Sequence, residues 1–131
     1  MAMTDNITMR KVDAIHHQNR EGLRELSFYQ YELNVMDERM RAITEKNTTH
    51  EIIENVAGFR ECLIKLQREV DQLNNDFTNE DFKLAVELQE KGKAESPNIN
   101  KAWQLHGRLL ALQDEIQTLR NKVNSFLSRV M

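Results

Sequence analysis

Four side chains near the start of the chain are of types that bind divalent metal ions. Asp13, His16 and His17 lie within five residues, and Glu21 follows His17 by four. On a helix, residues four apart share a face, so His17 and Glu21 together can supply two ligands to one metal ion. The remaining ligands would have to come from other parts of the chain.

The rest of the sequence does not complete such a metal site. A carboxylate-bridged metal bundle takes Glu-x-x-His from each of two helices, and no Glu precedes a His by three residues in this chain. Asp13 and His17 are more simply explained as an exposed pair one helical turn apart, and His50 with Glu54 repeats that spacing. We therefore predict no bound metal ion and no cofactor, and retain His17 and Glu21 only as weak metal candidates.

No combination of residues indicates catalysis. His106 follows the apolar Leu105 and is expected at the edge of a helix interface with one hydrogen bond. The predicted helices contain three single glycines, Gly22, Gly58 and Gly107, which suggest close helix approach or bending. None of them has the glycine spacing of a phosphate-binding loop. Spacing along helices gives no support to a Ser/His/Asp or Cys/His arrangement. We predict that the protein is not an enzyme.

Three stretches of the chain repeat apolar residues at alternating spacings of three and four, the pattern of a helix that buries one stripe against partner helices. The stripe positions are Val12, Ile15, Asn19, Gly22, Leu26, Tyr29, Leu33, Met36, Met40 and Ile43 in the first stretch, Ile52, Val56, Phe59, Leu63, Leu66, Val70, Leu73 and Phe77 in the second, and Leu105, Leu109, Leu112, Ile116, Leu119, Val123, Phe126 and Val130 in the third. Asn19 is the one side chain among them with a strong polar group at position a, where such a residue can fix the register of packing. Three stripes in one chain can cover one another.

Capping residues mark where these helices begin. Thr48 and Glu51 have the spacing of a capping box, and Ser96-Pro97 combines a favourable N-cap with proline at the first helical position. After Phe77 the next aromatic residue is five positions on, and the Asn, Asp and Thr side chains around Thr78 compete for backbone hydrogen bonds. The predicted helices are therefore 9–46, 49–77, 80–91 and 97–130.

These observations predict an all-α fold: an elongated antiparallel three-helix bundle with coiled-coil-type packing, similar in shape to a spectrin repeat, whose middle helix is kinked or broken near Thr78. Residues 1–8 are expected to be a flexible N-terminus, and residues 9–131 a single domain.

Composition restricts the partners that we expect. The 131 residues carry a formal net charge of −3 and a pI of about 5.8, the opposite of a nucleic-acid-binding footprint. No apolar run reaches the roughly 20 residues that cross a bilayer, and no secretory signal is recognisable. We expect a soluble, cytoplasmic protein that binds neither nucleic acid nor membrane. Cys62 is the only cysteine, expected as a small, partly buried residue.

Three bulky residues lie on the side of the first helix that faces away from its own apolar stripe. With Leu26 and Leu33 at position a, Phe28, Tyr31 and Val35 fall at positions c, f and c. We call these three residues the outer strip. Continuous exposed apolar residues often mark an interface. The alternative is that a bent middle segment, carrying Phe82, Val86 and Leu88, folds over the strip within the same chain.

The sequence therefore favours a non-enzymatic helical interaction module, such as a scaffold, adaptor or chaperone-like protein, which binds itself or another protein through one helix face. Self-association would most simply give a two-fold homodimer, since a closed symmetric contact buries the same patch on both copies. The alternative function is a metal-binding or small-molecule-sensing helical bundle.

Overall fold

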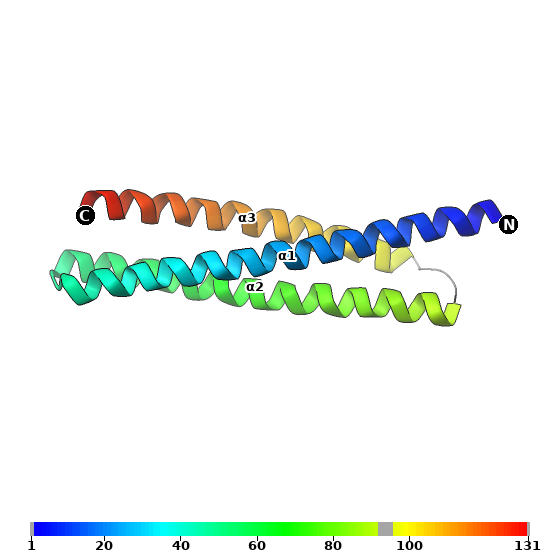
Figure 1. Cartoon of the computed structure of the whole chain (residues 1–131), viewed down its shortest axis with the longest axis horizontal. Helices are drawn as coiled ribbons and strands as arrows, with labels where there is room; N and C mark the ends of the chain where they lie inside the picture. The colour runs from blue at the N-terminus through cyan, green and yellow to red at the C-terminus, as the bar shows by residue number, and fades with distance from the viewer. Residues whose placement is uncertain (1, 92–95, 131) are drawn as a thin grey trace. The chain divides into compact units, whose positions relative to one another are not determined.

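The chain forms three long helices. The computed structural model describes the backbone of residues 2–91 and 96–130 and the side chains of residues 12–90 and 100–130. Helix α1 comprises Ala2–Lys46, α2 comprises His50–Lys91 and α3 comprises Ser96–Val130 (Figure 1). Within those ranges there is no strand, and no helix is long and apolar enough to cross a membrane. The all-α prediction is confirmed.

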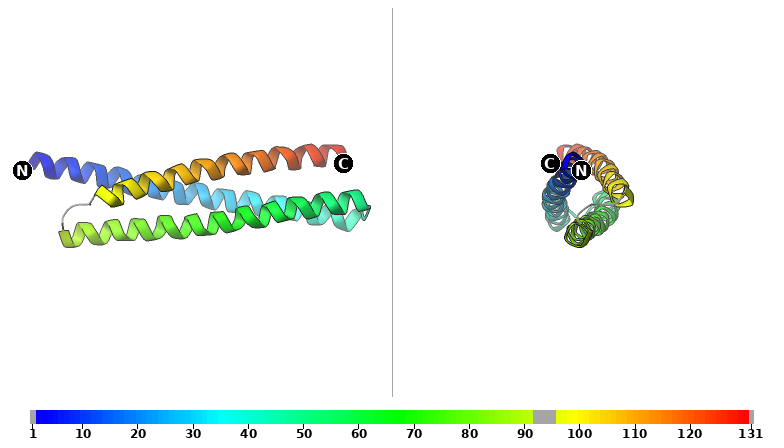
Figure 2. Two further views of the ribbon diagram at one scale, coloured as in Figure 1. Left: turned by 180° about the vertical axis from the view of Figure 1, so that it is seen from behind. Right: turned by 90° about the vertical axis from the view of Figure 1, so that its right-hand side faces the viewer.

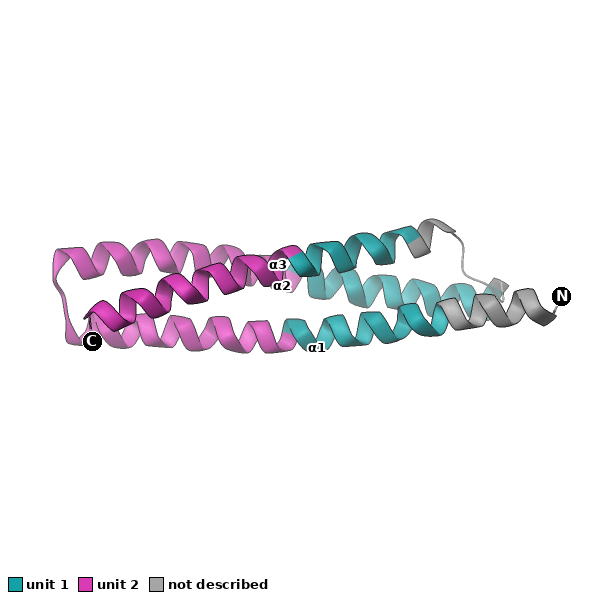
Figure 3. Cartoon of the chain, turned by 90° about the horizontal axis from the view of Figure 1, so that it is seen from above, with its two compact units in different colours: residues 1–26, 72–110 teal, residues 27–71, 111–131 magenta. Residues whose placement is uncertain are grey.

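The helices pack within two compact units, each of which takes one segment from every helix (Figure 3). Unit 1 comprises Met1–Leu26 and Gln72–Leu110, and unit 2 comprises Ser27–Asp71 and Ala111–Met131. Within each unit the α2 segment runs antiparallel to the α1 and α3 segments, and the three segments lie side by side (Figure 2). The three-helix bundle is thus confirmed, whereas the single domain over 9–131 stays a prediction.

The predicted apolar stripes form the core of both units. All their described positions are buried except three, Ile43, Phe59 and Val130, which are half-buried. Phe59 still packs in unit 2, where its ring centroid lies 5.3 Å from that of Phe126. Because burial follows the three-four spacing through each helix, the stripes identify which face of each helix meets its partners.

All three observed helices begin at positions that differ from the predicted starts of 9, 49 and 97. Helix α1 begins at Ala2, earlier than residue 9, while the flexibility predicted for residues 1–8 stays a prediction. At the turn before α2, the Thr49 N–H donates to Asn47 Oδ1 at 3.1 Å, and the Thr49 carbonyl accepts from the Ile53 N–H at 3.0 Å. Asn47 and Thr49 therefore organise this turn, in place of the predicted Thr48–Glu51 capping box.

Helix α3 begins at Ser96, one position before the predicted start of 97. The side chains of the predicted Ser96-Pro97 cap lie outside the described residues.

Helix α2 is not broken near Thr78. It continues without interruption to Lys91, so the separate helix predicted over 80–91 is wrong. The stripe in fact keeps its spacing through Phe77, Glu80 and Leu84, because a glutamate occupies a position where an apolar residue was expected. Thr78 Oγ1 donates to the carbonyl of Asn74 at 2.8 Å, which satisfies its hydroxyl within the helix. A kink at this position stays a prediction.

Candidate interaction surface

The outer strip lies on α1 within unit 2 and is open to solvent. Phe28 is 58% exposed and Tyr31 is 66% exposed, while Val35 is half-buried. The ring of Phe28 also lies 6.2 Å, centroid to centroid, from that of the buried Tyr29, at an interplanar angle of 58°. The strip therefore presents two aromatic side chains beside one another on the helix surface.

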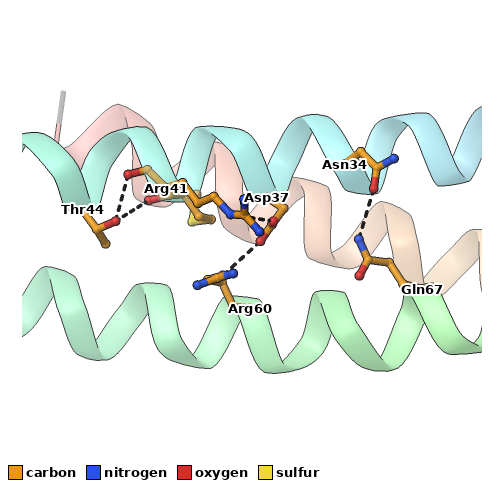
Figure 4. A network of polar contacts seen from close by, with 7 residues as sticks. Asn34, Asp37, Arg41, Thr44, Arg60 and Gln67 are labelled. Carbon is orange, nitrogen blue, oxygen red and sulfur yellow. Dashed lines mark hydrogen bonds and ion pairs between the residues drawn. The ribbon is translucent and has the colours of Figure 1, made fainter.

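One edge of the strip is defined by polar contacts between α1 and α2. Asp37 Oδ1 accepts from Arg60 Nε at 3.0 Å, and Asn34 Oδ1 accepts from Gln67 Nε2 at 3.3 Å (Figure 4). Asp37 also pairs with Arg41 of its own helix, at 3.1 Å. Arg60 and Gln67 are seven residues apart, so they repeat on the α2 face that meets α1.

The opposite edge is defined by an ion pair between α1 and α3. Glu32 Oε2 accepts from Arg120 Nε at 2.7 Å, and the Glu32 side chain is only 14% exposed. Glu32 Oε1 is buried without a hydrogen-bond partner among the described residues. Leaving a buried acceptor unsatisfied costs about 1–3 kcal/mol, so this carboxylate depends on Arg120 for its only partner there.

These contacts determine the direction in which the outer strip faces. Phe28, Glu32 and Val35 are spaced by four and three residues, so they share the side of α1 that meets α3. Tyr31 is opposite the buried stripe and points away from both neighbouring helices. The strip is thus an outward face of α1. Ion pairs to α2 on one side and to α3 on the other fix the orientation of α1 about its own axis.

The alternative of intrachain cover over the strip is not observed. The segment that would fold back under this alternative is part of the uninterrupted α2, and Phe82 is itself 69% exposed. Leu88 instead packs in unit 1 against a cluster of Val12, Ile15, Leu84 and Ala102. In the described part of the chain, no side chain buries Phe28 or Tyr31.

The candidate metal ligands do not converge. His16 Nδ1 lies 2.8 and 3.0 Å from the two carboxylate oxygens of Asp81, whereas Glu21 pairs with Arg24 of its own helix at 3.0 Å. His17 and Asp13 are both exposed. Across the described residues, no three His, Cys, Asp or Glu side chains lie close enough together to hold a metal ion.

Asp81 brings the buried Asn19 into a polar cluster in unit 1. Asn19 Nδ2 donates to Asp81 Oδ1 at 3.1 Å, so this carboxylate accepts from Asn19 and also lies beside His16. Asn19 is therefore a satisfied buried amide that joins α1 to α2. Its role in fixing the register of the two helices stays a prediction, now with a named partner.

Glu80 is a buried charged residue that the sequence analysis missed. It is 7% exposed, and its Oε1 lies 3.1 Å from Lys101 Nζ of α3 and 3.5 Å from Lys83 Nζ of α2. The spacing Phe77, Glu80, Leu84 continues the stripe and could have identified Glu80 as a core position. A carboxylate in that position ties α2 to α3 within unit 1.

The remaining candidate residues have ordinary surroundings. His50 and Glu54 form an exposed pair at 3.0 Å in the first turn of α2, and His106 is half-buried. Cys62 is exposed, so its expected role as a partly buried packing residue is wrong. The reason is its position: Leu63 and Leu66 occupy the buried stripe, and the residue before Leu63 points out of it.

Comparison of the chain with protein-family models, with curated proteins and with solved structures finds no match.

Proposed function

We propose that this protein is a non-enzymatic helical interaction module that binds a second copy of itself or another protein through the outer strip on α1. The observation that carries the proposal is the exposure of Phe28 and Tyr31, one turn apart on a helix whose rotation is held by Asp37 and Glu32. Aromatic side chains on a rigid support lose little conformational entropy on binding, which favours them at interfaces.

Self-association is the simplest form of this function. Two copies related by a two-fold axis would each bury the same strip, so a single surface is sufficient for a closed dimer. A scaffold or adaptor role would use the same strip for a different protein, whose complementary surface would have to be apolar.

Phe28→Asp tests the proposal, because an aspartate in the strip must be desolvated when the interface forms. We expect sedimentation velocity to show a wild-type dimer and a Phe28→Asp monomer of unchanged helicity by circular dichroism. Phe82→Asp is the matched control, since Phe82 is equally bulky and 69% exposed but lies outside the strip. It should remain dimeric.

Three other outcomes are informative. A wild-type protein that is monomeric at high concentration would remove the homodimer and leave the heterologous partner. Unfolding of Phe28→Asp, with Phe82→Asp intact, would mean that Phe28 serves the bundle itself. Equal weakening of association by both variants would remove the strip as the interface.

A further inference from the structure

A pocket opens in unit 2 where α1 ends, α2 begins and α3 ends. Its volume is about 650 Å³, within the range of roughly 300–1,000 Å³ typical of small-molecule sites. Residues from all three helices and from the turn between α1 and α2 line it. The pocket is separate from the outer strip, since none of the strip residues lines it.

The interior of the pocket is apolar. Its lining includes Ala42, Ile43, Ile52, Leu127 and Val130. Ile43 and Val130 are two of the three stripe positions that are not fully buried, so the core of unit 2 is left incompletely covered at this end. An apolar ligand that covers those side chains would remove their surface from water, which favours binding.

The polar lining of the pocket is basic. Arg39 and Lys46 are the charged residues of its described lining, and Asn47, Asn124 and Ser128 are neutral. No acidic side chain of the described residues lines the pocket, although the chain as a whole carries a net charge of −3. Among the described residues, an anionic ligand would therefore meet two cations and no carboxylate side chain.

These two cations differ in their ion pairing from Arg41, Arg60 and Arg120 of the same unit. Arg41 and Arg60 both pair with Asp37, and Arg120 pairs with Glu32, whereas Arg39 and Lys46 have no ion pair within the described residues. The helix dipoles do not cancel the positive charge of Arg39 and Lys46, because each helix terminus contributes only about half a charge. The positive N-terminus of α2 also opposes the negative C-termini of α1 and α3.

We infer that this pocket binds an anionic amphiphile, specifically a fatty carboxylate, with its alkyl chain against Ile43, Ile52 and Leu127 and its carboxylate beside Arg39 and Lys46. The apolar interior selects the chain, and the two cations select the sign of the head group. This inference does not depend on the function proposed for the outer strip.

Isothermal titration with three ligands of equal chain length, below their micelle concentrations, tests the inference. Decanoate should bind at least tenfold more tightly than decyltrimethylammonium, with the uncharged decanol between them. Methyl NMR spectra should show decanoate shifting the signals of Ile43, Ile52 and Leu127. Absence of decanoate binding, equal binding of all three ligands, or shifts confined to other methyl groups would overturn the inference.

Two sets of variants separate the head group from the chain. Arg39→Gln with Lys46→Gln should weaken decanoate binding roughly three- to tenfold, as expected for two partly exposed ion pairs, and leave decanol binding unchanged. Lys65→Gln with Arg68→Gln makes the same charge change at exposed positions outside the pocket and should have no effect. An equal loss in both double variants would reduce the inference to nonspecific attraction and overturn it.

Ala42→Phe tests whether the ligand occupies the pocket itself. Ala42 is exposed at its wall, so a phenylalanine can fill the space without displacing a buried core residue. Binding of both decanoate and decanol should be lost, with helicity retained. Unchanged decanoate binding in a folded Ala42→Phe protein would place the ligand elsewhere and overturn the inference.

Discussion

At the scale of single residues, the three described glycines have two different roles. A Cβ atom placed on Gly22 would lie 2.9 Å from Cζ of Phe77 and 3.1 Å from its Cε1, whereas Gly58 and Gly107 have nothing within 4 Å of that position. Close helix approach was one of the two interpretations of these glycines, the other being bending, and among the three it is observed only at Gly22. There the missing side chain makes room for a buried aromatic ring between α1 and α2 of unit 1.

Alanine substitution should change the stability of the protein in opposite directions at these two kinds of glycine. Gly58→Ala and Gly107→Ala should stabilise the protein by about 0.5–1 kcal/mol, because alanine is the better helix former and meets no neighbour. Gly22→Ala should destabilise it, because overpacking a core costs about 1–3 kcal/mol and offsets the same helical gain. Denaturant unfolding monitored by circular dichroism measures all three changes.

A second substitution identifies the cause at Gly22. Phe77→Leu removes the ring atoms nearest the new Cβ, so the Gly22→Ala change should be less unfavourable in that background. If Gly22→Ala stabilises the wild type as much as Gly58→Ala does, the packing of Phe77 against this glycine is not restrictive.

At the scale of elements, apolar spacing was sufficient to predict which face of each helix is buried, and it failed where charged residues are buried. The expected break in α2 came from the gap in apolar spacing after Phe77 and from the polar side chains around Thr78, whereas the buried Glu80 lies three residues after Phe77 and four before Leu84 and so continues the stripe. The polar contacts beside the stripe were not predicted: Arg60 and Gln67, seven residues apart on the α2 face toward α1, contact Asp37 and Asn34. The partner of each polar side chain depends on how neighbouring helices are offset along their axes, and the spacing of residues within one helix does not determine that offset.

The burial of Glu80 leads to a prediction about α2. Replacing a buried ion pair by an apolar residue is often neutral or stabilising, and the two lysines beside Glu80 are more than half exposed, so they can return to water. Glu80→Leu should therefore raise the free energy of unfolding by about 1 kcal/mol, while Glu80→Gln, which keeps the shape and loses the charge, should lower it. Urea unfolding of both variants is the measurement. A destabilised Glu80→Leu protein would show that pairing with Lys101 outweighs the cost of burying the carboxylate.

At the scale of the whole molecule, every helix passes from one compact unit into the other. Helix α1 crosses at Leu26, α2 at Asp71 and α3 at Leu110, each within an uninterrupted helix. Unfolding one unit alone would therefore interrupt three continuous helices and create three new helix ends, each with backbone groups that lack intrahelical partners. We expect the two units to unfold together as one cooperative transition.

Leu66→Ala tests this coupling, because Leu66 is buried in unit 2 and its truncation should cost about 2–5 kcal/mol. If the units unfold together, the slowest-exchanging backbone amides of unit 1 should exchange roughly 30-fold or more faster in hydrogen-exchange measurements, although the substitution lies outside that unit. Ile64→Ala, at a half-exposed position of the same unit, is the matched control and should change exchange little. Faster exchange confined to residues 27–71 and 111–130 would show instead that each unit unfolds independently, because the lost packing would then lower the stability of unit 2 alone.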